Sequence, residues 1–129
     1  LKAASQRQVE IVSAGFHPQY GRSADPIMVQ ETQSVGIDMT GWVSRLVTDE
    51  MLSSSDVIFV MEDSHWQRIK SDFPTYVSKT YLLSFAGKAQ VPQGEIEDPY
   101  GKSRKIYRKC ISEICLSVDG LINIINNKY

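Results

Sequence analysis

The sequence lacks the features that define several large classes of protein. Charges nearly balance over its 129 residues, with a formal net charge of -1 at pH 7, so the basic excess typical of a nucleic-acid-binding surface is absent. No apolar run approaches the roughly eighteen residues that a membrane span requires, and no charged-then-apolar leader opens the chain. These absences predict a cytoplasmic protein that binds neither nucleic acid nor membrane.

Cysteine is also scarce, with only Cys110 and Cys115 in the chain. Their spacing within a segment of helical period suits neither a disulfide nor a zinc site. We therefore expect two core thiols and no metal site. The chain begins with Leu1 rather than methionine, which suggests that preceding sequence is absent.

What the chain does contain is an ordinary globular balance, 42% hydrophobic and 22% charged, which predicts a single domain over residues 1–129. Short apolar runs alternate with helical patterns, and this alternation predicts an α/β fold with a parallel sheet. The expected strands lie at residues 9–15, 56–61 and 79–84. The expected helices begin at Asp25-Pro26, after a cap at Thr48 and after a cap at Asp63 or Ser64, and a long amphipathic helix covers residues 106–125.

A long irregular stretch, residues 85–101, contains the sequence "EIEDPYGKS". Ligands of open α/β sheets bind beyond the carboxyl ends of the strands. We therefore expect residues 13–15, residues 61–63 and the loop with Asp98 to lie near one another.

Six segments together resemble a known family. "VEIVSAG", "GRSADP", "VGID", "SSSDVIFVMEDSH", "YLLS" and "IEDPYGKS" follow the order and approximate spacing of the low-molecular-weight protein tyrosine phosphatases, most closely the bacterial members associated with exopolysaccharide export. The resemblance covers nearly all of the chain. It implies a three-layer αβα fold with a small parallel sheet, of the phosphotyrosine protein phosphatase I type, from which the first strand and most of the first helix are absent.

The resemblance also implies an activity. Members hydrolyse phosphomonoesters with a cysteine thiolate held in a C-x5-R phosphate-binding loop, form a phosphocysteine and need no metal or other cofactor. The implied substrates are phosphotyrosine proteins or small aryl phosphates. Asp98 matches the family aspartate that protonates the leaving phenolate and then acts as base toward water, which is general acid-base chemistry.

Other site residues follow from the same resemblance. Pro99 restricts the backbone at Asp98 and helps to aim its carboxyl, and Tyr100 matches the aromatic wall of the substrate cleft. Phe16, His17 and Tyr20 occupy the loop that forms the opposite wall, and Ser13 matches a serine that supports the phosphate loop. His65 is expected to be a solvated helix residue.

The pattern departs from the family at its centre, because neither cysteine opens a C-x5-R loop. Leu116 and Leu121 stand where the arginine would be. The catalytic loop is therefore truncated from this sequence, supplied by another segment or chain, or lost with a changed fold. A catalytically inactive binding or regulatory module is the alternative to an enzyme. Arsenate reductase is less favoured, and phosphoarginine specificity stays open.

Overall fold

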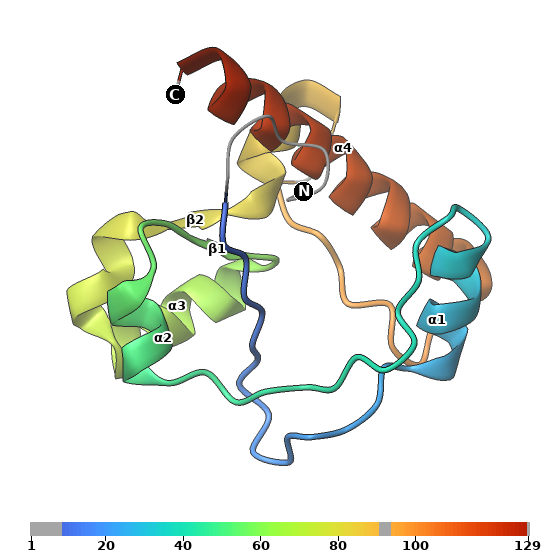
Figure 1. Cartoon of the computed structure of the whole chain (residues 1–129), viewed down its shortest axis with the longest axis horizontal. Coiled ribbons are helices and arrows are strands. Elements are labelled where there is room, and N and C mark those ends of the chain that lie inside the picture. The colour runs from blue at the N-terminus through green and yellow to red at the C-terminus, as the bar shows by residue number, and fades with distance from the viewer. Residues whose placement is uncertain (1–8, 91–93, 129) are drawn as a thin grey trace.

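The computed structural model of the chain describes residues 9–90 and 94–128. Two short strands lie between helices, with α4 on one side and α2 and α3 on the other (Figure 1). The strands pair in parallel, and Phe59 lies opposite Tyr81. In chain order the elements are α1 (Pro26–Gln33), α2 (Asp49–Ser54), β1 (Ile58–Val60), α3 (Asp63–Asp72), the 3₁₀ helix η1 (Pro74–Lys79), β2 (Thr80–Leu82), the 3₁₀ helix η2 (Leu83–Gln90) and α4 (Arg104–Lys128).

The alternation of side chains along β1 produces two cores, one on each face. Phe59 and Met61 pack on a cluster formed by Leu83, Ile96 and Cys110. Val60 belongs to a second cluster with Leu52 and Ile69, and Ile58 packs against it. Successive side chains of a strand point to opposite faces, so both faces need cover. The helical layers supply that cover, and the predicted three-layer α/β fold is confirmed.

Local signals in the sequence set where the helices begin. Asp25 caps α1, accepting a hydrogen bond from the N–H of Ile27 at 3.1 Å, and Thr48 caps α2 through the N–H of Met51 at 3.2 Å. Both starts are as predicted. The prediction for α3 is wrong by one or two residues, because Glu62 is the cap and its side chain pairs with the backbone of the first turn.

The predicted strand at residues 9–15 does not form. Residues 9–14 belong to no strand, and Gly15 makes a single isolated bridge with Leu46. Ile11 and Val12 are 49% and 58% exposed. An apolar, β-branched run favours extended backbone, but a strand also needs a hydrogen-bonded neighbour. Within the described residues β1 pairs only with β2, so this segment has no strand beside it.

The last helix, α4, confirms the predicted long amphipathic segment. Its inner face buries Tyr107, Cys110, Ile111 and Ser117, which follow one another at three, one and six residues. Cys110 is a buried free thiol in the core, as expected, whereas Cys115 is only half-buried, so the prediction of two buried core thiols holds for Cys110 alone. In the part of the chain that the structure describes, no helix has the length and apolar character needed to cross a membrane.

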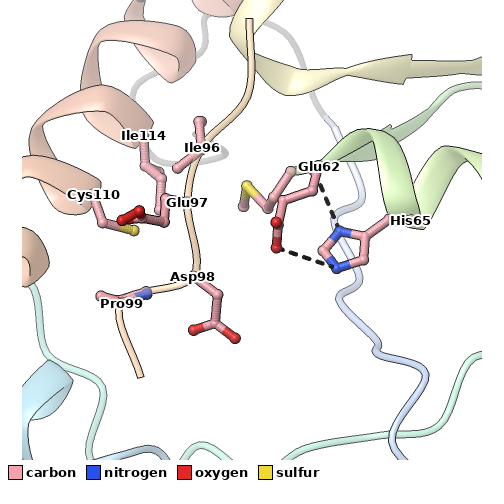
Figure 2. Close-up of a pocket in the computed structure, with 9 residues that line it drawn as sticks. Glu62, His65, Ile96, Glu97, Asp98, Pro99, Cys110 and Ile114 are labelled. Atoms are coloured by element: carbon pink, nitrogen blue, oxygen red, sulfur yellow. Dashed lines mark hydrogen bonds and ion pairs between the residues drawn. The ribbon is translucent and has the colours of Figure 1, made fainter. Parts of the chain in front are cut away.

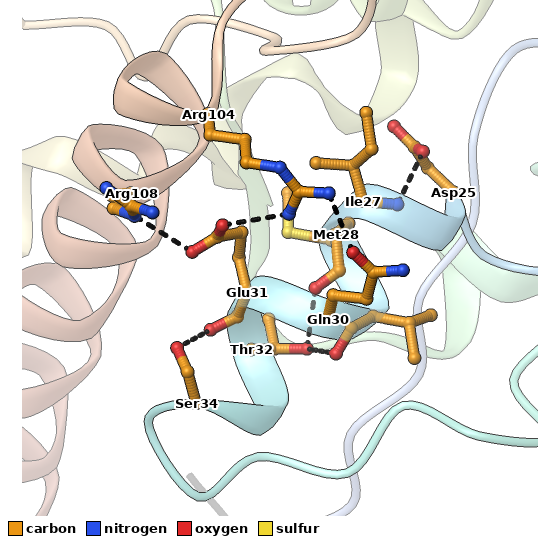
Figure 3. Close-up of polar contacts among 10 residues, drawn as sticks. Asp25, Ile27, Met28, Gln30, Glu31, Thr32, Ser34, Arg104 and Arg108 are labelled. Carbon is orange, nitrogen blue, oxygen red and sulfur yellow. Dashed lines mark hydrogen bonds and ion pairs between the residues drawn. The ribbon is translucent and has the colours of Figure 1, made fainter.

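A group of charged residues joins α1 to the start of α4 (Figure 3). Glu31 of α1 has a side chain only 8% exposed, and its carboxylate accepts from Arg104 at 3.1 Å and from Arg108 at 3.0 Å. Arg104 also donates to Gln30 at 2.8 Å. Hydrogen bonds from Arg108 and then Arg104 lower the pKa of Glu31 below its ordinary value of 4.5.

Glu31→Gln should therefore destabilise the protein in a pH-dependent way. A carboxyl whose pKa is lowered by folding contributes stability above its unfolded pKa, near 4.5, and loses that contribution as the pH falls through the lower folded value. We expect the melting temperature of Glu31→Gln to lie several degrees below wild type at pH 7, with the gap closing toward pH 3. Thermal unfolding across this range measures it. Glu10→Gln, at an exposed position, is the control, and a gap that stays constant with pH would contradict the prediction.

Candidate active site

A pocket of about 240 Å³ lies beyond the carboxyl end of β1 (Figure 2). The apolar part of its lining comes from the end of β1, from the loop that contains Asp98 and from α4. Its polar part consists of three carboxylates and one imidazole. The lining residues are Met61, Glu62, His65, Ile96, Glu97, Asp98, Pro99, Cys110 and Ile114. The structure thus brings Asp98 together with residues 61 and 62, as the rule for open α/β sheets predicts.

The loop that carries Asp98 is anchored on its entry side by Ile96. The Ile96 side chain is 1% exposed, and its N–H donates to the carbonyl of Met61 at 2.8 Å. This bond extends the hydrogen bonding at the end of β1 to the loop. Asp98 therefore lies two residues beyond the buried Ile96, and the bond from Ile96 to Met61 couples the position of Asp98 to the sheet.

A tight turn follows and orients the Asp98 carboxyl. One carboxylate oxygen, Oδ1, accepts from the N–H of Tyr100 at 3.0 Å, and the carbonyl of Pro99 accepts from the N–H of Lys102 at 2.9 Å. Gly101 has φ +76°, a backbone conformation that residues with a Cβ rarely adopt. Pro99 is buried and fixes its own φ. These features leave Oδ2 of Asp98 as the oxygen available to a ligand.

His65 lines the pocket, a role that its interpretation as a solvated helix residue did not include, and its side chain is 36% exposed at the start of α3. Its Nδ1 accepts from the N–H of Glu62 at 3.3 Å, so the neutral ring carries its proton on Nε2. Nε2 lies 3.8 Å from the Glu62 carboxylate, and the ring lies 5.9 Å from that of Phe16. Glu62 and His65 bond reciprocally at the start of α3 as a capping box does, but the pair does not match the S/T-x-x-E/Q sequence signature, so no sequence pattern indicated this arrangement.

The other predicted site residues lie outside the pocket lining. Tyr100 is next to Asp98 but 76% exposed, and Tyr20 is 65% exposed. His17 is exposed, and its Nδ1 accepts from the N–H of Gln19 at 3.0 Å. Phe16 is half-buried against the cluster of Leu52, Val60 and Ile69, and Ser13 is exposed. The structure therefore groups Asp98 and Pro99 with Glu62 and His65, and does not bring Ser13, Phe16, His17 or Tyr20 into the same lining.

Cys110 is the thiol in the pocket, but its environment suppresses its reactivity. Burial, followed by the negative charges of Glu113, Asp98 and Glu97, raises its pKa to about 11. The thiolate is the nucleophilic form of cysteine, and reactive cysteines have lowered pKa values beside cations or helix N-termini. Cys110 has the opposite surroundings, so its position in the pocket does not make it a nucleophile.

We therefore expect Cys110 to resist alkylation in the folded protein. With a pKa of about 11 the thiolate is a very small fraction of the total at pH 8, and iodoacetamide should modify Cys110 at least about a hundredfold more slowly than in urea-unfolded chain. Peptide mass spectrometry after timed quenching gives the rate at this site. Equal rates in folded and unfolded protein would show that the thiol is neither buried nor shifted.

The fold is similar to the folds of known phosphatases. The crystal structure of the Erwinia amylovora tyrosine phosphatase AmsI superposes with a TM-score of 0.78 at 28% identity, over 85% of this chain and 70% of that one. The YwlE arginine phosphatase from Geobacillus stearothermophilus gives 0.83 at 24% identity, over 92% and 75% of the two chains. These neighbours define the fold as that of the low-molecular-weight phosphatases.

Sequence relationships are more specific. AmsI, which bears the name "probable low molecular weight protein-tyrosine-phosphatase", is 34% identical over 107 residues, covering 83% of this chain and 71% of its own length. EpsP of Ralstonia nicotianae, with a name of the same form, is 28% identical over 114 residues, or 88% and 75% of the two lengths. The profile of the low molecular weight phosphotyrosine protein phosphatase family matches residues 2–129. The chain belongs to this family.

Proposed function

We propose that this chain is the proton-donating part of a cysteine-dependent protein tyrosine phosphatase, with Asp98 as its general acid and base. One observation supports this proposal above all others. Asp98 is held between a buried anchor at Ile96 and the turn at Gly101, with its carboxyl at the mouth of a pocket beyond the sheet. A general acid needs this kind of fixed position, since proton transfer requires hydrogen-bond reach to the leaving oxygen.

The proposed reaction has two steps. A cysteine thiolate attacks phosphorus, the bond between phosphorus and the phenolic oxygen breaks, and the Asp98 carboxylic acid gives its proton to that oxygen. Water then attacks the phosphocysteine, the Asp98 carboxylate takes a proton from the water, and the S–P bond breaks to release phosphate and the thiolate. The chain returns to its starting state, and neither step needs a metal or a redox cofactor.

The charged groups that the described residues place in the pocket do not include the positive charge that a phosphate dianion needs. Among the residues that the structure describes, the lining has three carboxylates, Glu62, Glu97 and Asp98, and no lysine or arginine. Glu97 is paired with Lys102 at 3.1 Å, and the Glu62 carboxylate lies 3.8 Å from Nε2 of His65. A phosphate dianion is repelled by such a lining and requires cationic or N–H donors. We propose that a C-x5-R loop outside residues 1–129 supplies both the thiolate and this positive charge.

The proposal also assigns roles around Asp98. Pro99 holds the turn, and Tyr100, exposed at the rim, stacks against the phenolic ring of a phosphotyrosine. Phe16, His17 and Tyr20 remain proposed substrate contacts on the facing loop, and Ser13 a proposed support for the phosphate-binding loop. The substrate is a phosphotyrosine protein or a small aryl phosphate.

A specific observation also favours a second function, a catalytically inactive binding module. Cys110 and Cys115 are the two cysteines of the chain, neither begins a C-x5-R sequence, and Cys110 has a raised pKa. A module of this kind would keep the pocket and its turn without turning over a phosphate ester. It would bind a partner at the same surface.

Turnover by the protein expressed from its complete reading frame distinguishes the two functions. We expect hydrolysis of p-nitrophenyl phosphate that is unchanged by a metal chelator and inhibited by vanadate, together with a phosphorylated cysteine trapped by rapid quenching. Phosphotyrosine and phosphoarginine peptides, assayed in parallel, establish the substrate class. A reading frame without a C-x5-R sequence, or a full-length protein that hydrolyses none of these esters, would reject the enzyme in favour of the binding module.

A further inference from the structure

Two hydrogen bonds tie the entry side of the Asp98 loop to the ends of the strands. The Gly94 carbonyl accepts from the hydroxyl of Ser84, which lies at the start of η2 directly after β2 and is 2% exposed. The N–H of Ile96 donates to the carbonyl of Met61, the residue after β1, at 2.8 Å. Both bonds use backbone groups of the loop, and they fix the path of the chain into it.

A third bond uses a side chain of the loop and reaches a different element. Oε1 of Glu95 accepts from the backbone N–H of Asp63 at 2.5 Å, across 32 positions of the sequence. Asp63 is the first residue of α3, and the N–H groups of a first helical turn have no acceptor within their own helix. The Glu95 carboxylate supplies one, at the positive end of the helix dipole, where a negative charge is favourable. This bond therefore joins the loop directly to α3.

The start of α3 forms the wall of the pocket across from Asp98. Glu62 caps the helix and His65 lies in its first turn, and both line the pocket together with Asp98. Figure 2 shows the loop with Asp98 on one side and these two side chains on the other. Glu95 lies three residues before Asp98 and bonds to the N–H directly after Glu62. Its carboxylate thus connects the two walls of the pocket at a point close to both.

Other polar contacts of the loop set its shape. The bonds from the Tyr100 N–H to Asp98 and from the Lys102 N–H to the Pro99 carbonyl lie within the turn. The ion pair of Lys102 with Glu97 also joins two parts of the same loop. These contacts move with the turn, so they do not set its distance from α3. That distance depends on apolar packing and on the bonds of the entry side.

We propose that Glu95 is a positioning residue for Asp98, acting through its carboxylate to hold the loop against the first turn of α3. The inference rests on the proposed function, because it assigns a support to the general acid of that reaction. A general acid must stay within hydrogen-bond reach of the leaving oxygen, and a small displacement lowers the rate. Loss of the bond to Asp63 widens the range of positions open to the loop, so the Asp98 carboxyl reaches the leaving oxygen less often.

In the full-length protein, Glu95→Ala is expected to lower kcat/KM by about tenfold for phenyl phosphate and by less than about threefold for p-nitrophenyl phosphate. Proton donation matters most when the leaving oxygen is strongly basic, so a misplaced acid slows phenyl phosphate more. Amide hydrogen exchange at Asp63 should become faster, because that N–H loses its acceptor. No fall in kcat/KM, an equal fall for the two esters, or unchanged exchange at Asp63 would overturn the positioning role.

Glu95→Gln is the conservative variant and separates the hydrogen bond from the charge. The amide oxygen of glutamine can still accept from the Asp63 N–H. We therefore expect kcat/KM for both esters to stay within about threefold of wild type, and the exchange of Asp63 to stay slow. If Glu95→Gln loses as much activity toward phenyl phosphate as Glu95→Ala, the hydrogen bond does not position the loop and the inference is overturned.

Glu50→Ala is the matched control. Glu50 is an exposed acid in the first turn of α2, so its removal also takes a negative charge from a helix start, but from a helix that contributes no residue to the pocket lining. Both kcat/KM values and the exchange of Asp63 should remain those of wild type. A fall like that of Glu95→Ala would indicate a general effect of charge at helix starts and count against the inference.

Asp98→Asn separates failure of this inference from failure of the proposed function. If Asp98→Asn slows phenyl phosphate more than p-nitrophenyl phosphate and Glu95→Ala does not, the positioning role is overturned and the general acid stands. If Asp98→Asn itself shows no such difference, or the wild-type protein hydrolyses neither ester, the proposed function fails and this inference with it.

Discussion

Asp98→Asn in the full-length protein is expected to lower kcat/KM for phenyl phosphate by about 10²–10⁴-fold, the usual contribution of a positioned general acid. The asparagine keeps the side-chain oxygen that accepts from the N–H of Tyr100 at 3.0 Å, so the turn is preserved while the proton is lost. The fall should be smaller for p-nitrophenyl phosphate, since its leaving oxygen is less basic. Steady-state kinetics with the two esters measure both effects.

The control for this variant is Asp38→Asn, because Asp38 makes the same kind of local turn. Its Oδ1 accepts from the N–H of Thr40 at 2.9 Å, and the residue is exposed, far along the chain from the pocket. This variant should retain full activity. Dissociation constants for phosphate should change little in either variant, because the proton donor acts on the leaving group. Wild-type turnover of phenyl phosphate by Asp98→Asn would reject the acid assignment.

Ile96→Ala is expected to lower the free energy of unfolding by about 2–5 kcal/mol, the range for removing most of a buried aliphatic side chain. Ile96 is 1% exposed and packs with Leu83 and Cys110 in a buried apolar cluster. For a domain whose total stability is typically about 5–15 kcal/mol, this is a large fraction. Urea denaturation followed by tryptophan fluorescence measures the change.

Ile37→Ala supplies the matched comparison, because Ile37 is 42% exposed and its backbone N–H, which donates to the Thr32 carbonyl at 2.9 Å, is kept. A change within about 0.5 kcal/mol is expected there. Similar losses at the two positions would mean that the loop residue is not part of the core. The comparison also tests the entry anchor of Asp98, since Ile96→Ala should loosen the loop as well as the core.

Much of the fold follows from short-range patterns. Asp25-Pro26 and Thr48 start their helices where the sequence predicts, because a capping side chain needs only the backbone of the next few residues. The amphipathic period of residues 106–125 identifies α4 for the same reason. The segment at residues 9–15 was predicted wrongly. Its composition favours extended backbone, but whether it joins a sheet depends on a neighbour that composition does not encode.

The candidate site, like the fold, has some residues that the sequence identifies and others that only the tertiary structure brings to it. Asp98, Pro99 and Tyr100 are recognisable in the sequence because they are consecutive and match a family motif, and the structure places the first two in a pocket. His65 was missed as a pocket residue because its role arises from the meeting of the α3 start with a loop more than thirty residues away.

The sequence by itself determined the starts of α1 and α2, the long amphipathic helix α4 and the family, and it identified Asp98 as the residue proposed to be the acid. Each of these depends on residues close together in the chain or on a motif. The tertiary structure alone decided that Glu62 and His65 line the same pocket as Asp98, that the Cys110 thiol is buried with a raised pKa, and that Tyr107 of α4 donates to Asp25 at the start of α1. The physical reason is that these contacts join residues up to 82 positions apart, and packing of the layers, which local propensity does not specify, brings them together.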